Sequence, residues 1–250
     1  MKAHQRVIRE QQARAELHVV PKDFSQATVR EISKSEAKQV ILPYEWLGNM
    51  GSTRYAFGLF FNGELAGVEC FGSTAGTNTS VSVCGPKYRE RVLTLCRGAC
   101  VHWAHPHSAS YLIPRACEML GAKGFNIFVA YADEQAGEIG TVYQACNWLY
   151  CGYAATRGSL LQSPEGRLMD ERNIGHYARC RSQLKSFFFK PTRAEIKQRL
   201  LEMGHKIIPR SPKHRYVQVC GSPALKRDLM DALRWPIYPY PKRVSSDYRG

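Results

Sequence analysis

FNIFVAYADEQAGEIGTVYQACNWLYCG, residues 125–152, is the stretch of sequence that decides the fold. Residues 125–131 form a short, unbroken apolar run, which is typical of a buried strand. Asp133 follows this run, a helix is expected over 140–149, and residues 150–155 predict a further strand. A strand, a helix and a strand in succession, with an acid at the end of the first, indicate an α/β layer that carries a site at one edge.

The segment before this stretch adds a hairpin and a short helix. Asn62-Gly63 is a strong signal for a two-residue hairpin turn, and Ser33 with Glu36 has the spacing of a capping box. The expected elements are a strand at 28–32, a helix at 34–42 that ends before Pro43, hairpin strands at 54–61 and 64–72, a loop at 73–80 and a strand at 91–96.

A helix is also expected between residues 108 and 121. Pro114 lies inside this segment, and proline is tolerated only in the first turn of a helix. Ser110 is therefore the expected cap, with the helix running from about Tyr111 to Leu120.

The last third of the chain is expected to be mixed in structure. Residues 156–178 are polar and loop-like, and Thr192 with Glu195 predicts a capped helix at 192–203. A strand is expected at 213–220, a helix at 222–233 and an extended strap at 235–243. Together the elements predict an α/β (α+β) fold with a central mixed β-sheet flanked by helices.

Composition places the chain among intracellular globular proteins. It has 250 residues, of which 44% are hydrophobic, and no long uncharged apolar run that would suggest a membrane span. The nine cysteines are scattered and odd in number, so buried thiols are expected in preference to a disulfide framework. We therefore expect a cytoplasmic protein.

Positive charge is concentrated at one end of the sequence. Residues 1–178 contain 18 Lys and Arg against 16 Asp and Glu, whereas residues 179–250 contain 17 against 5. Aromatic residues, including those at 187–189, are interleaved with these charges, which predicts a nucleic-acid-binding surface. The alternative is a basic tail that has no partner.

Three blocks of the sequence resemble a known family. They are LCRGACVHWAHPHSASYLIPRACEML, then VAYADEQAGEIGTVYQACNWLYCG, then KHRYVQVCGSPALKRDLMDALRWPIYPYPK. They resemble the phage Mom family of DNA adenine modification proteins, over roughly residues 28–243, and the order of elements resembles that of the GNAT acyltransferase fold.

This resemblance implies a function. Mom-type proteins convert adenine N6 in DNA to a carbamoylmethyl-type adduct (methylcarbamoylation), which protects bacteriophage DNA from host restriction in the infected cell. The partner implied is double-stranded DNA. The implied organisation is an N-terminal arm at 1–27, a GNAT-like catalytic domain at 28–178 and a basic DNA-binding extension at 179–250.

The donor molecule is not identified by the sequence. A GNAT-like fold implies an acyl-CoA-type donor, but ordinary GNAT enzymes hold its pyrophosphate on a glycine-containing turn before a helix. The corresponding segment here, HPHSASYLIPRA, has no glycine pair. Two other functions stay open: an acyl-CoA-dependent N-acetyltransferase acting on a protein or small molecule, and a non-catalytic DNA-binding protein.

Four residues are candidates for catalysis, each with a structural alternative. Asp133 would orient the amine or take its proton, or else cap a turn. Tyr143 would donate a proton, or else be a core tyrosine. Arg97 would clamp an anion, or else form a surface ion pair. Ser110 would assist at the site, or else only cap its helix. The expected cofactor-binding residues are Ser108, Ser110 and Asn147.

Further residues are candidates for holding DNA or a metal. Tyr44 or Trp46 would stack on an adenine rotated out of the duplex, or else pack in the core. Phosphate contacts are expected from Lys185, Lys190, Lys213 and Arg215, together with Arg193 and His214. No metal is expected, although His102, His105 and His107 are ligand types that keep a weak metal hypothesis open.

Overall fold

The computed structural model describes residues 4–15, 19–74, 76, 78–154, 159–166, 168–171, 174 and 192–242. The chain divides into two compact units, each described by itself below. The first contains residues 1–154 and 213–250, and the second contains residues 155–212.

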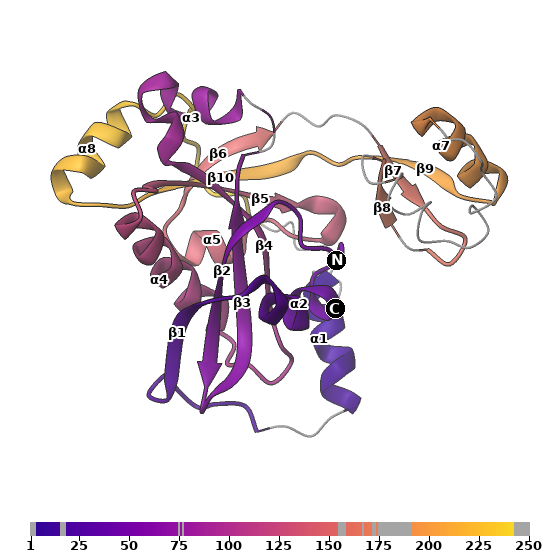
Figure 1. The fold of residues 1–250 in the computed structure, drawn as a ribbon, viewed down its shortest axis with the longest axis horizontal. Coiled ribbons are helices and arrows are strands. Elements are labelled where there is room, and N and C mark those ends of the chain that lie inside the picture. Colours follow the sequence, from indigo (N-terminus) through magenta and orange to yellow (C-terminus); the bar gives the residue numbers. More distant parts are fainter. Residues whose placement is uncertain are drawn as a thin grey trace, which may run out of the picture. The chain divides into compact units, whose positions relative to one another are not determined.

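A seven-stranded mixed sheet is the centre of the first unit (Figure 1). The strand order is β1-β2-β3-β4-β5-β10-β6. Neighbouring strands are antiparallel except β4 and β5, which are parallel. This confirms the predicted mixed α/β fold class. The strands are β1 (Ala27–Ile32), β2 (Thr53–Phe61), β3 (Glu64–Gly72), β4 (Val92–Cys100), β5 (Ile127–Asp133), β6 (Leu149–Ala154) and β10 (Lys213–Val219).

Helices cover both faces of this sheet. Along β5, Phe128 and Ala130 pack in the core that contains α4, whereas Ile127 and Val129 pack with residues of α3 and α8. Helix α2 packs against β2, β3 and β4, and Figure 1 shows it on the side of these strands away from α4. The helices are α1 (His4–Ala15), α2 (Lys34–Tyr44), α3 (Thr79–Tyr88), α4 (Ser108–Ala122), α5 (Thr141–Ala145) and α8 (Pro223–Asp231), with single turns η1 (Arg89–Arg91) and η2 (Glu134–Ala136).

The second unit has a small sheet of its own. Strands β7 (Ser159–Gln162), β8 (Leu168–Asp170) and β9 (Lys206–Pro209) are antiparallel in the order β8-β7-β9. Helix α7 (Arg193–Glu202) has the predicted capping box between Thr192 and Glu195. The expectation that 156–178 is a loop was therefore wrong for β7 and β8. Residues 187–189 lie outside the described part of the chain.

The division of the chain differs from the predicted one. A boundary at 178/179 was expected, with 179–250 as an extension packed on the catalytic domain. Instead β10 lies between β5 and β6, in the interior of the main sheet. The second unit is therefore an insertion between two strands of the first. The sequence showed the strand at 213–220 but not its place in the sheet.

Helix α4 begins earlier than predicted and continues through a proline. It starts at Ser108, so Ser110 is inside the first turn and Pro114 is in the helix interior. Pro114 has no N–H, and this leaves the carbonyl of Ser110 without its helical donor. The Cys146 thiol donates to that carbonyl, at 3.7 Å. The carbonyl that Pro114 leaves unpaired thus gains a partner 36 residues away in the sequence, which the sequence of the helix alone does not predict.

Three other local predictions were wrong in extent. Helix α2 includes Pro43 and ends at Tyr44, although Pro43 has no N–H to donate to the carbonyl of Gln39. Part of the expected loop at 73–80 begins α3, which was not predicted. Helix α5 has only five residues because Asn147 leaves the helical region, with φ of 57°.

Gly140, the residue before the short helix α5, packs against the ring of Tyr216. Gly140 has φ of 78°, and a Cβ at this position would lie 2.3 Å from Cε2 of Tyr216. The Tyr216 hydroxyl donates to the carbonyl of Ile139 at 2.5 Å and accepts from Gln144 at 3.1 Å. Close packing and backbone conformation therefore both require glycine here.

The C-terminal segment, predicted as an extended strap, packs along β6. The Tyr238 N–H donates to the carbonyl of Tyr150 at 2.9 Å, and the Tyr240 hydroxyl donates to the carbonyl of Trp148 at 2.9 Å. None of the helices in the described ranges is long and apolar enough to cross a membrane.

Gly140→Ala should destabilise the protein by at least about 2 kcal/mol, because it combines overpacking against Tyr216 with left-handed backbone strain. Gly63→Ala is the matched control, since Gly63 has φ of 85° but a Cβ there would meet nothing within 4 Å. It should cost only about 1 kcal/mol. Urea unfolding followed by circular dichroism measures both values, and equal losses would contradict the packing argument.

Candidate functional site

The candidate site lies where β4 and β5 separate. Their parallel pairing extends only from Val92–Ile127 to Leu95–Ala130. Beyond this point β4 stays paired with β3, and β5 stays paired with β10. The carboxyl ends of two adjacent parallel strands therefore part from each other, and ligands bind at such places in open α/β sheets.

Asp133 lies at the end of β5 and is part of a buried ion pair. It is 4% exposed, and its Oδ2 is 2.7 Å from Nζ of Lys213, the residue opposite it on β10. Its Oδ1 accepts the N–H of Gln135 at 3.0 Å. Each carboxylate oxygen retains a second lone pair, so Asp133 both caps a turn and keeps the capacity to accept a further hydrogen bond.

Arg97 fixes the loop that follows α2. Its guanidinium donates to the carbonyl and the side chain of Asn49, at 2.8 and 2.6 Å. Its Nε is also 3.6 Å from Oε2 of Glu45, a buried residue that sequence reasoning did not select. Burial raises the pKa of Glu45, whereas Arg97 and the more distant charge of Lys213 lower it. The Arg97–Glu45 and Lys213–Asp133 pairs therefore form one electrostatic cluster.

A second cluster lies on the other face of the sheet. Glu69 of β3 is 3% exposed, and burial, followed by the charge of Glu138, raises its pKa well above 4.5. Burial also raises the pKa of Tyr143 well above 10.0, with further contributions from Glu69 and Glu138. Tyr143 was predicted as a site residue. Glu69 was missed, although an acid inside the apolar strand 64–72 is a signal in the sequence.

The N-terminus of α4 contributes two serines. Ser108 is buried, and its Oγ has no hydrogen-bond partner in the described part of the chain. The Ser110 Oγ donates to the carbonyl of His107 at 3.0 Å, within the same turn. Ser110 does not cap the helix as expected, but it lies beside Cys146 at the end of α5.

The residues before α4 do not fit an acyl-CoA held in the usual glycine-dependent way. The segment 101–107 has no glycine, so bulky side chains lie where backbone would have to approach a pyrophosphate. Side chains of helix α1 also donate hydrogen bonds to backbone carbonyls near this segment. Gln5 donates to the carbonyl of Gly98 at 2.7 Å, and Arg9 donates to the carbonyl of Ala104 at 3.0 Å.

The histidines near α4 do not converge on one point. His102 shares a hydrogen bond with the Tyr44 hydroxyl at 2.7 Å, while the His105 ring contacts Phe24 edge-on. No group of three or more His, Cys, Asp or Glu among the described residues is arranged to hold a metal ion. Tyr44 is buried and Trp46 is half-buried, and stacking on a base stays a prediction for both.

Several residues that were predicted to contact DNA form interactions with other residues of the protein. Lys213 pairs with Asp133, and Arg215 stacks on the Trp235 ring while donating to the carbonyl of Cys151. His214 is 2% exposed, so the expectation that it contacts phosphate was wrong. Its Nε2 lies 3.0 Å from Oε1 of Glu134, and its Nδ1 shares a hydrogen bond with Tyr150. Lys185 and Lys190 lie outside the described residues, and Arg193 is exposed on α7.

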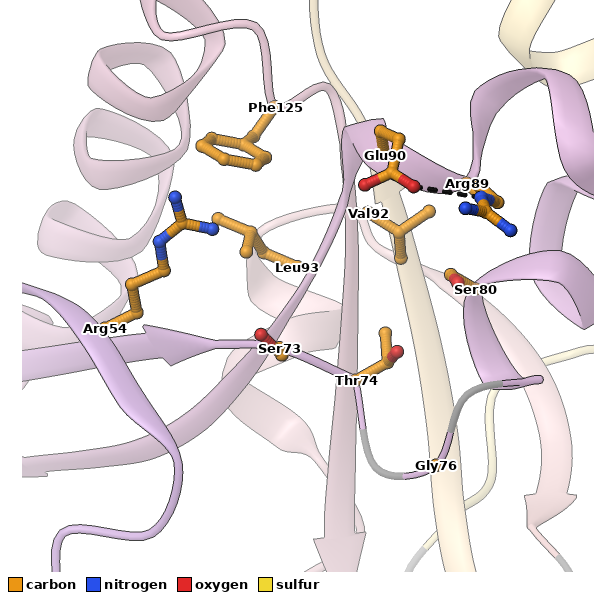
Figure 2. Close-up of a pocket in the computed structure, with 10 residues that line it drawn as sticks. All are labelled: Arg54, Ser73, Thr74, Gly76, Ser80, Arg89, Glu90, Val92, Leu93 and Phe125. Atoms are coloured by element: carbon orange, nitrogen blue, oxygen red, sulfur yellow. Dashed lines mark hydrogen bonds and ion pairs between the residues drawn. The ribbon is translucent and has the colours of Figure 1, made fainter.

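A pocket of about 490 Å³ lies at the other end of β4 (Figure 2). Val92 and Leu93, at the start of that strand, line it, and Figure 2 shows the Arg54 guanidinium beside the Phe125 ring. Arg89 and its neighbour Glu90, which also line the pocket, form an ion pair with each other. None of the predicted site residues lines this pocket, so it is separate from the candidate site.

Comparison with known proteins finds one matching family model and several solved structures of low sequence identity. The model of the Mom protein family matches residues 26–242. No curated protein matches the chain. Similar solved structures include an N-acetyltransferase from Staphylococcus aureus Mu50, with 13% identity, a TM-score of 0.42, and coverage of 78% of this chain and 99% of that chain.

Two further structures are similar to the same degree. An IAA acetyltransferase from Bacillus cereus ATCC 14579 has 10% identity and a TM-score of 0.39, and a Bacillus subtilis acetyltransferase in complex with CoA has 12% and 0.40. Each covers 78% of this chain and 99% of its own. At these identities and TM-scores the structures do not identify a substrate or cofactor for this chain.

Asn147, predicted to bind a cofactor, is an exposed residue in the left-handed conformation that ends α5. Asn147→Ala should cost about 1 kcal/mol of stability, because alanine tolerates this conformation poorly. Asn147→Gly should be neutral or slightly stabilising. Thermal and urea unfolding measure both, and a full loss of function in the glycine variant with unchanged stability would restore the predicted binding role.

His214 should make the protein acid-sensitive. Burial lowers its pKa below 6.5, although Glu134 acts in the opposite direction. The unfolded chain therefore binds a proton that the folded chain does not, so stability falls as pH drops through 6.5. His214→Gln should flatten this dependence in urea titrations between pH 5 and 8. His107→Gln, at an exposed histidine, should leave it unchanged; equal slopes in all three proteins would refute the assignment.

Proposed function

The chain belongs to the Mom protein family, and on that premise we propose that it is a transferase that modifies adenine in double-stranded DNA. The product proposed is a carbamoylmethyl-type adduct on N6, which would protect phage DNA from host restriction in the infected cell. The observation that carries the proposal is the buried Asp133 carboxylate at the point where β4 and β5 separate.

The exocyclic amine of adenine is a weak nucleophile because its lone pair is delocalised into the ring. A carboxylate that accepts an N–H hydrogen bond orients this amine and draws proton density from it. Lys213, at 2.7 Å, holds the Asp133 side chain in one position, and the adjacent Glu45–Arg97 pair fixes the loop that carries Trp46. Trp46 is the aromatic side chain that we assign to stacking on the rotated base.

Tyr143 supplies a proton-bearing group on the opposite face of the sheet. A tyrosine phenol is neutral at physiological pH, and burial raises the pKa of Tyr143 further above 10.0, so its hydroxyl can donate a hydrogen bond. In this proposal the ligand lies where β4 and β5 separate and contacts both Asp133 and Tyr143.

The charge distribution supports DNA as the partner. Residues 1–154 carry 15 Lys and Arg against 13 Asp and Glu, which is nearly balanced, whereas residues 155–212 carry 12 against 5. The inserted unit therefore has a formal charge of +7, and residues 213–250 add 8 against 3, or +5. Such surfaces bind the phosphate backbone with strong salt dependence and little sequence preference.

Expression of the wild-type chain in bacteria should add a carbamoylmethyl-type deoxyadenosine to plasmid DNA, detected by mass spectrometry of the digested nucleosides. Asp133→Ala should reduce this product by at least about 100-fold, because the amine loses its orienting acceptor. DNA binding, measured by fluorescence anisotropy, should stay within about twofold, since most affinity comes from phosphate contacts.

Asp231→Asn, at an exposed position of α8, is the control and should modify DNA normally. Normal modification by Asp133→Ala would show that the site is placed wrongly. Salt-sensitive DNA binding with unmodified nucleosides would favour a non-catalytic DNA-binding protein. Calorimetric binding of acetyl-CoA in the absence of DNA modification would favour an N-acetyltransferase.

A further inference from the structure

Glu69 is a buried acid with an unsatisfied oxygen. Its side chain is 3% exposed, and Oε2 has no hydrogen-bond partner in the part of the chain that the structure describes. The residue opposite it on β4 is Gly98, where a Cβ would lie 2.1 Å from that oxygen. The missing side chain of Gly98 therefore makes room for the carboxyl group, at the part of β4 that has separated from β5.

No cation among the described residues compensates Glu69. The titratable groups that interact electrostatically with it are another acid, a phenol and thiols, and the shift of its pKa arises from burial and from Glu138. They are Glu138 after η2, Tyr143 and Cys146 on α5, Cys117 on α4, Cys100 on β4 and Cys70 on β3. Arg9 of α1 acts on Cys100, but its guanidinium is bonded to the carbonyl of Ala104.

Glu69 is therefore a neutral carboxylic acid at physiological pH. Burial of an ionised carboxylate without a cation or hydrogen-bond donors is so unfavourable that the group takes up a proton instead. A neutral acid has one O–H donor. Tyr143, the other O–H group of this cluster, is a phenol that is neutral at physiological pH, and burial raises its pKa further.

We propose that Glu69 and Tyr143 act together as two neutral O–H donors that hold a carbonyl oxygen of the group being transferred. The proposal rests on the proposed function and deepens it by adding a catalytic residue. Both acids keep their protons, and no bond to Glu69 forms or breaks. The pair stabilises negative charge as it develops on that oxygen, in a site that excludes water. The ligand class is a carbonyl-bearing donor.

Two substitutions distinguish this role from that of a general base. Glu69→Gln keeps the shape and an N–H donor but cannot accept and release a proton, whereas Glu69→Leu loses the donor. In the nucleoside assay Glu69→Gln should stay within about tenfold of wild type, and Glu69→Leu should lose roughly 100- to 1,000-fold, as for other lost oxyanion donors. Glu118→Gln, at an exposed position of α4, should be unaffected.

Each other outcome overturns the proposal. If Glu69→Gln is as inactive as Glu69→Leu, the residue is a base. If Glu69→Leu is folded, binds DNA and modifies it normally, Glu69 has no catalytic role. Unfolding curves and DNA-binding affinity are measured for every variant, so that loss of the fold is recognised as such.

A second measurement does not depend on activity. Below pH 4.5 the carboxyl is protonated in both the folded and the unfolded chain. As pH rises above 4.5 the unfolded chain loses this proton while the folded chain retains it, so wild type should lose stability relative to Glu69→Gln. The ratio of their unfolding constants should change by up to about tenfold per pH unit until the folded acid ionises.

Urea titrations of both proteins from pH 4 to 8 test this. Parallel curves would show that Glu69 ionises normally and would overturn the neutral donor, whatever the activity. If the curves diverge but wild type yields no modified adenine, the proposed function has failed while the neutral state of Glu69 stands. In that case the donor pair is rejected for adenine modification.

Discussion

The parting of β4 from β5 after the Leu95–Ala130 pair is the constraint on which the candidate site depends. Each strand continues because its outer neighbour, β3 or β10, still provides hydrogen bonds. The sheet can therefore open between its two central parallel strands without losing either of them. Polar side chains, whose burial in a continuous core would cost free energy, lie on both faces of the sheet near this opening.

The polar groups on the two faces differ in kind. On one face, acids are matched with cations, and the Asp133–Lys213 and Glu45–Arg97 pairs stay close to one another. Buried ion pairs contribute little net stability, because desolvation offsets their attraction. On the other face, no cation among the described residues compensates Glu69, and burial raises its pKa well above 4.5. Beside this separation, one face of the sheet thus has ion-paired acids and the other has an acid without a cation. The proposed reaction uses the first kind as an acceptor and the second as a donor.

Local rules predicted local structure well. The Asn62-Gly63 turn and the capping boxes at Ser33 and Thr192 all formed, since each depends on residues within three positions. Asp133 was identified for the same reason, because an acid directly after an apolar strand is visible in the sequence. The rest of the structure depends on contacts between residues that are far apart in the sequence. The sequence alone could not show that Cys146 compensates for Pro114, nor that Gly98 makes room for Glu69.

The place of β10 in the sheet has a consequence for biosynthesis. Strands β5 and β6 are made before it, yet neither pairs with the other, and β10 fills the position between them only after the inserted residues 155–212 have been synthesised. Until then the interior strand β5 and the edge strand β6 each lack the partner that β10 provides, and such open strand edges promote aggregation of nascent chains. The long sequence separation of these contacts also favours slow folding. The ribosome must therefore release nearly the whole chain before the main sheet can close.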